Sequence, residues 1–149
     1  MDKIIIEQTN DYPKRMKYDP DKNTFYETEW DSLSYVRGVT FPYGWLKDSG
    51  TPPNEHLDVI LMSMEHCELG DELPIRIIGV FKRYDSDHKL VAVHVKRNEV
   101  DFTELPDDEK NELLKLYPRI DVSVGEGWFG TEIANEVIND FYKNGRKRG

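Results

Sequence analysis

Short segments rich in β-branched and aromatic residues fill the first two thirds of the chain, and Pro, Gly, Asn and Asp separate them. Such segments predict strands, and the residues between them predict turns. In the clearest case, Val91, Val93 and Val95 alternate with a mixed set of residues, which is the period of a strand with one apolar face. We expect strands over residues 4–7, 16–18, 24–30, 35–39, 57–63, 75–84 and 89–96.

Helical patterns follow in the last third. Pro106 and three acidic residues after it suit the first turn of a helix, whose dipole favours negative charge, and we expect this helix to end near Pro118. A short strand over residues 120–124 comes next. A second helix is expected from about Thr131, stopped by Gly145, because its apolar residues recur at helical spacing.

This order of elements predicts the fold class. Many short antiparallel strands followed by terminal helices favour a closed barrel, because closure hides the unpaired edges of strands. We therefore expect a mainly β (α+β) protein, a small closed OB-like β-barrel with two C-terminal helices. A chain of 149 residues suits one domain, so residues 1–149 are expected to form a single domain.

Charge and composition narrow the classes of molecule that this chain is expected to bind. The chain has 29 acidic and 20 basic residues, a net charge of −9, which disfavours nucleic acid and anionic membranes as partners. An oligonucleotide-binding barrel would fit the strand count but not this charge. The single cysteine, Cys67, excludes an intrachain disulfide, and the opening MDKIIIEQ has too short an apolar run for a signal peptide. We expect a cytoplasmic protein.

The strongest candidate chemistry lies in the sequence Asp85-Ser-Asp-His-Lys89, between two apolar segments. Hard cations such as Mg²⁺ prefer carboxylate oxygens together with water and phosphate, and a lysine beside them can contact the phosphate. The competing interpretation is an ordinary polar hairpin turn, since Asp and Ser are common in turns. Both interpretations stay open on the sequence alone.

A second candidate group surrounds Asp58, which directly precedes the apolar run VILM. A carboxylate facing the core there would be costly unless it were paired or bound to a metal, although a half-exposed acid at the strand entrance is an equal alternative. Further groups that suit a phosphate or metal site are Glu7, Lys17, Asp19 and Tyr43, because hydroxyls and ammonium groups donate to phosphate oxygens.

At these residues the chain resembles the soluble family I inorganic pyrophosphatases, from about residue 4 to residue 141. The stretches that carry the resemblance are IIIEQ, RMKYDPDKNT, PYGWL, LDVIL and, most specifically, ELGDELPIRIIGVFKRYDSDHKLVAV. The resemblance implies Mg²⁺-dependent hydrolysis of pyrophosphate, or a related small phosphoanhydride, to phosphate by a metal-activated water. It also implies Mn²⁺ as an alternative ion and assembly into homo-oligomers.

The resemblance also implies roles for individual residues. Asp58, Asp85 and Asp87 would bind metal, and Glu55 with Asp58 would be catalytic. Glu7 and Asp19 would support the cleft. The phosphate-binding residues would be Lys17, Tyr43, Lys89, Tyr117 and Arg119.

The chain departs from the family pattern at several of these positions. The motif D-G-D-P-x-D reads Pro53-Asn-Glu-His-Leu-Asp58 here, so Pro53 replaces a metal ligand and Glu55 replaces the aspartate that orients the attacking water. An arginine expected on the third strand is missing, and Arg119 follows Pro118, where a lysine is expected. The alternative expectation is therefore a catalytically impaired protein that binds phosphate or metal, or that hydrolyses a different phosphoanhydride.

Overall fold

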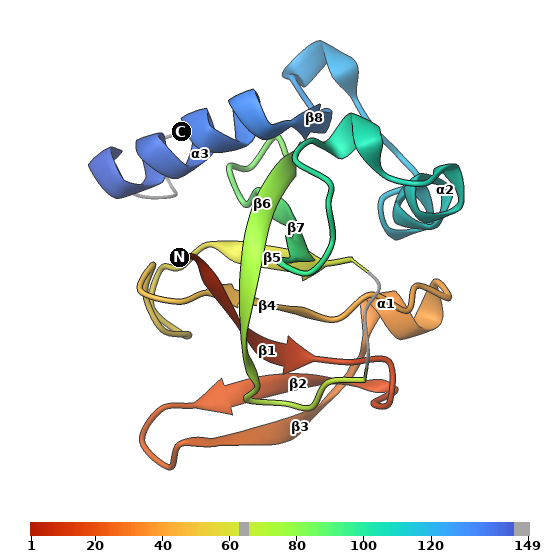
Figure 1. The fold of residues 1–149 in the computed structure, drawn as a ribbon. Coiled ribbons are helices and arrows are strands. Elements are labelled where there is room, and N and C mark those ends of the chain that lie inside the picture. The colour runs from red at the N-terminus through yellow and green to blue at the C-terminus, as the bar shows by residue number, and fades with distance from the viewer. Residues whose placement is uncertain (63–65, 145–149) are drawn as a thin grey trace.

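The computed structural model describes residues 1–62 and 66–144 and shows a closed barrel (Figure 1). Its strands are β1 (Lys3–Gln8), β4 (Tyr43–Leu46), β5 (Asp58–Leu61), β7 (Lys89–His94) and β6 (Glu72–Lys82), in that order. The barrel closes because β6 also pairs with β1. The pair β5–β7 is parallel and the others are antiparallel, while β8 (Gly127–Gly130) extends the sheet beyond β6. This architecture confirms the predicted mainly β, OB-like barrel.

A two-stranded hairpin, β2 (Lys14–Asp19) and β3 (Thr24–Asp31), lies beside the barrel at the bottom of Figure 1. The buried amide of Gln8 attaches it to β1, donating to the carbonyl of Lys14 at 3.1 Å and accepting from the backbone N–H of Met16 at 2.7 Å. The Tyr18 ring packs on Trp45 of β4 with centroids 5.4 Å apart. These contacts hold the hairpin as a fixed wall next to the barrel.

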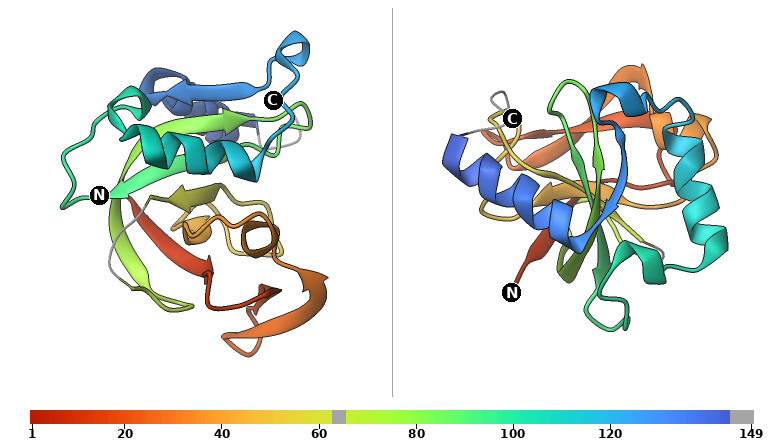
Figure 2. Two further views of the ribbon diagram at one scale, coloured as in Figure 1. Left: turned by 90° about the vertical axis from the view of Figure 1, so that its right-hand side faces the viewer. Right: turned by 90° about the horizontal axis from the view of Figure 1, so that it is seen from above.

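Three helices complete the described part of the chain: α1 (Leu33–Val36), α2 (Asp107–Leu116) and α3 (Thr131–Asn144). The view from above in Figure 2 shows α2 and α3 on opposite sides of the strands. Ala134 and Val137 of α3 join one apolar cluster with the barrel strands, and Leu113 and Leu116 of α2 join another. The two predicted C-terminal helices are confirmed. No helix among residues 1–62 and 66–144 is long and apolar enough to cross a membrane.

The parallel pair β5–β7 is buried on both faces. Val59 and Leu90 belong to the cluster under α3, whereas their neighbours Ile60 and Val91 belong to the cluster under α2. Strands that are covered on both faces have continuous apolar runs in their sequence, which explains VILM in the β5 segment and LVAV in β7. The register of this pair is therefore fixed by two apolar layers at once, and it places Asp58 opposite Lys89.

Two predicted strands are wrong. Residues 35–39 begin inside α1, because the Ser32 hydroxyl accepts the backbone N–H of Tyr35 and caps a helical turn. Within residues 120–124, Val122–Val124 form a 3₁₀ turn, since the Asp121 carboxylate accepts the N–H of Ser123. The strands β4 and β8 form instead in segments containing glycine, where no strand was predicted. Gly145 and residue 63, the expected ends of a helix and a strand, lie outside the described residues.

Asp101 joins several of these elements and generates a stability prediction. Its carboxylate accepts the N–H of Thr131, the first residue of α3, at 2.8 Å and that of Thr103 in the 3₁₀ turn η1 (Phe102–Glu104) at 3.1 Å. Hydrogen bonds to charged groups contribute about 1.5–3 kcal/mol, and exposure to solvent reduces this contribution. We expect Asp101→Ala to lower the free energy of unfolding by about 1 kcal/mol in urea denaturation.

These hydrogen bonds lower the pKa of Asp101 from 3.8 to about 2. Its contribution is therefore fully present above pH 3.8 and is lost as the pH falls through about 2, so the wild type and Asp101→Ala should converge in stability in that window. The control is Asp121→Ala, which removes a cap from the short turn η2 (Val122–Val124) and should cost less. Equal losses in both variants at neutral pH would contradict the prediction.

Candidate functional site

Asp58 and Lys89 open the parallel strands β5 and β7, and their side chains form a buried ion pair. Lys89 Nζ lies 2.7 Å from Asp58 Oδ2, and the two residues are only 6% and 5% exposed. Burial alone would raise the pKa of Asp58, but the hydrogen bonds from His56 and Lys89 outweigh it and hold this pKa well below its usual range. Burial alone would lower the pKa of Lys89, but the negative charge of Asp58 raises it. Both groups are therefore charged at neutral pH.

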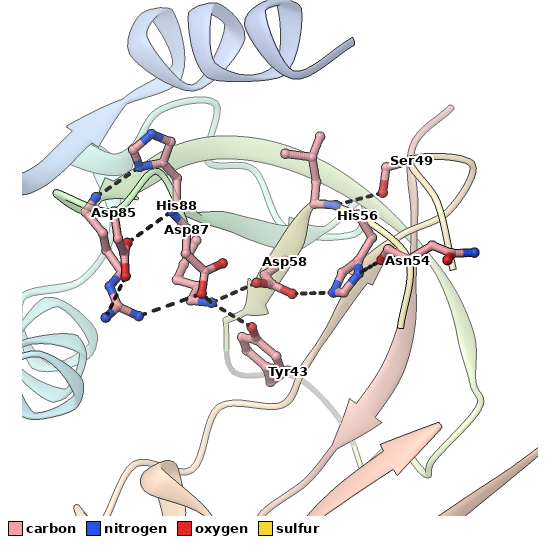
Figure 3. A network of polar contacts seen from close by, with 11 residues as sticks. Tyr43, Ser49, Asn54, His56, Asp58, Asp85, Asp87 and His88 are labelled. Atoms are coloured by element: carbon pink, nitrogen blue, oxygen red, sulfur yellow. Dashed lines mark hydrogen bonds and ion pairs between the residues drawn. The ribbon is translucent and has the colours of Figure 1, made fainter. Parts of the chain in front are cut away.

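His56 contacts the other oxygen of Asp58, as Figure 3 shows. Its Nε2 lies 2.9 Å from Asp58 Oδ1, and its Nδ1 lies 2.7 Å from the carbonyl oxygen of Asn54. A carbonyl and an ionised carboxylate only accept hydrogen bonds, so these two contacts suit an imidazole ring that donates from both nitrogens. The adjacent Leu57 is fixed through its backbone N–H, which donates to the buried hydroxyl of Ser49 at 3.0 Å.

The charged network continues from Lys89 to the loop between β6 and β7. Lys89 Nζ lies 3.1 Å from Asp87 Oδ2 and 3.2 Å from the hydroxyl of Tyr43. Arg83 then lies between Asp87 and Asp85, and the shortest nitrogen–oxygen distances are 3.9 and 3.4 Å. Burial raises the pKa of Tyr43 well above its ordinary value, so its hydroxyl keeps its proton. Positive and negative groups thus alternate along the whole network.

Most of this network lines a cavity of about 750 Å³ between the barrel and the β2–β3 hairpin, and the members that do so are His56, Asp58, Tyr43, Lys89, Asp87 and Arg83. Three of the sequence-predicted site residues do not line it: Glu55, Asp85 and Arg119 are exposed and lie outside the lining. Asp85 instead contacts Arg83 and accepts the backbone N–H of Asp87 at 3.1 Å. The predicted residues that do line the cavity are Glu7, Lys17, Asp19, Tyr43, Asp58, Asp87, Lys89 and Tyr117.

The sequence did not single out three basic residues of this cavity, namely His56, Arg15 and Arg83. His56 precedes Asp58 by two positions, the spacing of residues on one face of an extended chain, so that spacing was an available signal. Arg83 directly precedes the acidic loop. Arg15 belongs to the same hairpin as Lys17 and carries no distinct signal of its own.

The carboxylates of this cavity suit a metal that arrives with its substrate. Among the described residues, no three His, Cys, Asp or Glu side chains converge in a group that could hold a metal ion. Mg²⁺, however, is usually bound through one or two carboxylates, with water and substrate phosphate as its other ligands. Asp58 and Asp87, which contact the same lysine, provide such oxygens. The donor set therefore fits an ion shared with phosphate rather than one enclosed by protein alone.

The buried ion pair generates a prediction for stability. Removing one partner of a buried pair leaves an uncompensated charge, which typically costs about 3–5 kcal/mol, whereas replacing both partners costs far less. We expect Lys89→Met to lower the free energy of unfolding by about 3 kcal/mol in urea denaturation. The double variant Asp58→Asn with Lys89→Met should recover part of this loss. Additive losses from the two substitutions would contradict the prediction.

Comparison with known proteins agrees with this geometry. The family model described as inorganic pyrophosphatase matches residues 4–145. No curated protein matches the chain significantly. Similar solved structures are the inorganic pyrophosphatases of Neisseria gonorrhoeae (19% identity, 97% of this chain and 91% of that one, TM-score 0.73), Helicobacter pylori (15%, 95% and 91%, 0.68) and Thermus thermophilus (18%, 92% and 86%, 0.67). Because the family model covers nearly the whole chain, this protein belongs to the inorganic pyrophosphatases, a family that hydrolyses inorganic pyrophosphate and generally uses a divalent metal.

Proposed function

We propose that the cavity around Asp58 and Lys89 hydrolyses inorganic pyrophosphate, or a closely related phosphoanhydride, with Mg²⁺ as its ion and Mn²⁺ as an alternative. The observation that carries this proposal is the buried Asp58–Lys89 pair, which aims an ammonium group and a carboxylate into one cavity. The same cavity is lined by hydrogen-bond donors that suit phosphate oxygens and by carboxylates. Phosphoryl transfer requires this combination, since catalysis there is mostly positioning and charge stabilisation.

Phosphate binding is assigned to Lys89, Tyr43, Tyr117 and Lys17. Burial raises the pKa of both Tyr43 and Tyr117, so both hydroxyls stay protonated and can donate to phosphate oxygens. Lys89 is held between carboxylates, and its ammonium group is already positioned before an anion arrives. Donors that need no rearrangement stabilise developing charge most effectively.

Metal binding is assigned to Asp58 and Asp87, whose oxygens would share the ion with substrate. A bound divalent ion would polarise the phosphoryl oxygens and lower the pKa of a bound water. Asp85 lies outside the cavity lining, so we assign it to positioning the Arg83 side chain, 3.4 Å away.

The proton acceptor for the attacking water is assigned to Glu7 in preference to Glu55. Glu7 lines the cavity and is 8% exposed, whereas Glu55 is exposed and outside the lining. Burial, and next the charge of Asp58, raises the pKa of Glu7 above its ordinary value, while the pKa of Asp58 is lowered. A base is most effective when its pKa approaches the working pH, which favours Glu7.

A second candidate function is binding without turnover. Pro53 lines the cavity where the family pattern has a metal-binding aspartate, and proline offers no side-chain ligand. Pyrophosphate binding measured by calorimetry without phosphate release would support this function.

As part of the same proposal, and on family resemblance alone, we expect one domain over residues 1–149, a cytoplasmic location and homo-oligomers. Sedimentation would test the oligomeric state.

The principal test is phosphate release from pyrophosphate. We expect turnover with Mg²⁺ or Mn²⁺, and a loss of at least a hundredfold in Asp58→Ala, since removing one charge-stabilising group typically costs about 10²–10³ in rate. The matched control is Asp11→Ala, an acidic residue outside the cavity lining, which should keep full activity. Absence of release from the wild type, or undiminished release from Asp58→Ala, would overturn the proposal.

The assignment of the proton acceptor has its own paired test. We expect Glu7→Gln to lower kcat by about 10²-fold or more, as loss of a general base does, with a small change in KM. Glu55→Gln should leave kcat within about twofold of wild type. The reverse result would return the role to Glu55.

A further inference from the structure

The cavity is almost balanced in charge, although the chain as a whole carries −9. Its lining contains five carboxylates, Glu7, Asp19, Asp21, Asp58 and Asp87, against four permanent cations, Arg15, Lys17, Arg83 and Lys89. A cavity of this composition does not repel a phosphate anion as the rest of the molecule does.

Arg83 lines the cavity and lies in the polar network beyond Lys89 and Asp87. It directly follows β6, and its backbone N–H donates to His88 Nδ1 at 2.9 Å, which fixes the main chain at the start of the loop. Its guanidinium carbon lies 5.7 Å from the centroid of the Tyr117 ring. The side chain is 29% exposed, so it is packed along its length and still open to the cavity.

The carboxylates beside Arg83 position its guanidinium without saturating it. The distances to Asp85 and Asp87 are 3.4 and 3.9 Å, longer than the 2.7–3.2 Å of direct hydrogen bonds. A guanidinium carries five N–H donors in a planar fork that matches phosphate oxygens in pairs. Asp87 is also 3.1 Å from Lys89, so the same carboxylate lies beside both cations and both line the same cavity.

We propose that Arg83 binds a phosphate group of the substrate directly, and that it gives the cleft affinity for pyrophosphate in the absence of any divalent ion. This inference rests on the proposed function only in taking the same cavity as the substrate site. In this arrangement side-chain cations supply part of the positive charge that binding of a phosphoanhydride requires. A divalent ion would then join an anion that these side chains already hold.

The experiment is calorimetric titration of pyrophosphate into protein freed of metal by a chelator. We expect saturable binding to the wild type and affinity about tenfold to a hundredfold lower in Arg83→Ala, the range for losing hydrogen bonds to a charged group. Arg83→Lys keeps the charge but loses the fork and should be intermediate. The matched control is Lys82→Ala, which removes the neighbouring cation. Lys82 lines a separate cavity of about 220 Å³ beside α3, so this variant should bind pyrophosphate as the wild type does.

The outcomes separate this inference from the proposed function. Undetectable binding to the metal-free wild type, or equal affinity in Arg83→Ala and Lys82→Ala, would overturn the role of Arg83 even if turnover with Mg²⁺ were measured. Binding that depends on Arg83 without turnover would uphold the inference and remove the hydrolytic function. If thermal melting shows Arg83→Ala to be unfolded, the affinities of Arg83→Lys and wild type for pyrophosphate are compared instead. Equal affinities would then overturn the role of Arg83.

Discussion

The structure depends on the buried ion pair between Asp58 and Lys89. Burying each of these charges alone would cost several kcal/mol, so the two residues must meet in good geometry or not be buried at all. They meet because β5 and β7 lie parallel in a register that two apolar layers fix from opposite faces. The fold and the candidate site therefore share one constraint: a slip of either strand by one residue would turn its side chains toward the opposite apolar cluster and separate the charges.

The other charged groups follow from that pair. Asp58 accepts from His56 and Lys89 on its two oxygens, and Lys89 also contacts Asp87 and Tyr43. Alternating charges hold one another in place before any anion enters. Under the proposed function, a phosphate near Lys89 would meet oriented donors, and its oxygens would replace carboxylate oxygens as their partners. Preorganised polar groups act in this way in enzyme sites, because little reorganisation remains to be done during the reaction.

The sequence predicts the barrel well because its strongest signals are periodic. The apolar runs of β5, β6 and β7 are long enough to identify as strands. The segment after Ser32 was predicted as a strand but forms α1, because the Ser32 hydroxyl caps a helical turn. In the site, Asp87 and Lys89 face the cavity as their spacing of two suggests. Asp85 does not, because its carboxylate closes a turn onto the N–H of Asp87. Whether a polar residue faces inward is decided by such turns, and no residue pattern specifies them alone.

The differences from the family pattern concern two separable tasks, binding the anion and activating water. Pro53 removes a candidate metal ligand, while Arg83 brings positive charge to the same cavity. A side-chain cation is attached to the chain and needs no ion to be recruited, so it can replace a metal in holding phosphate. It cannot replace a metal in acidifying a bound water, because that requires direct coordination of the water oxygen. Loss of a metal-binding carboxylate beside retained side-chain cations is therefore expected to preserve affinity for phosphate more readily than turnover.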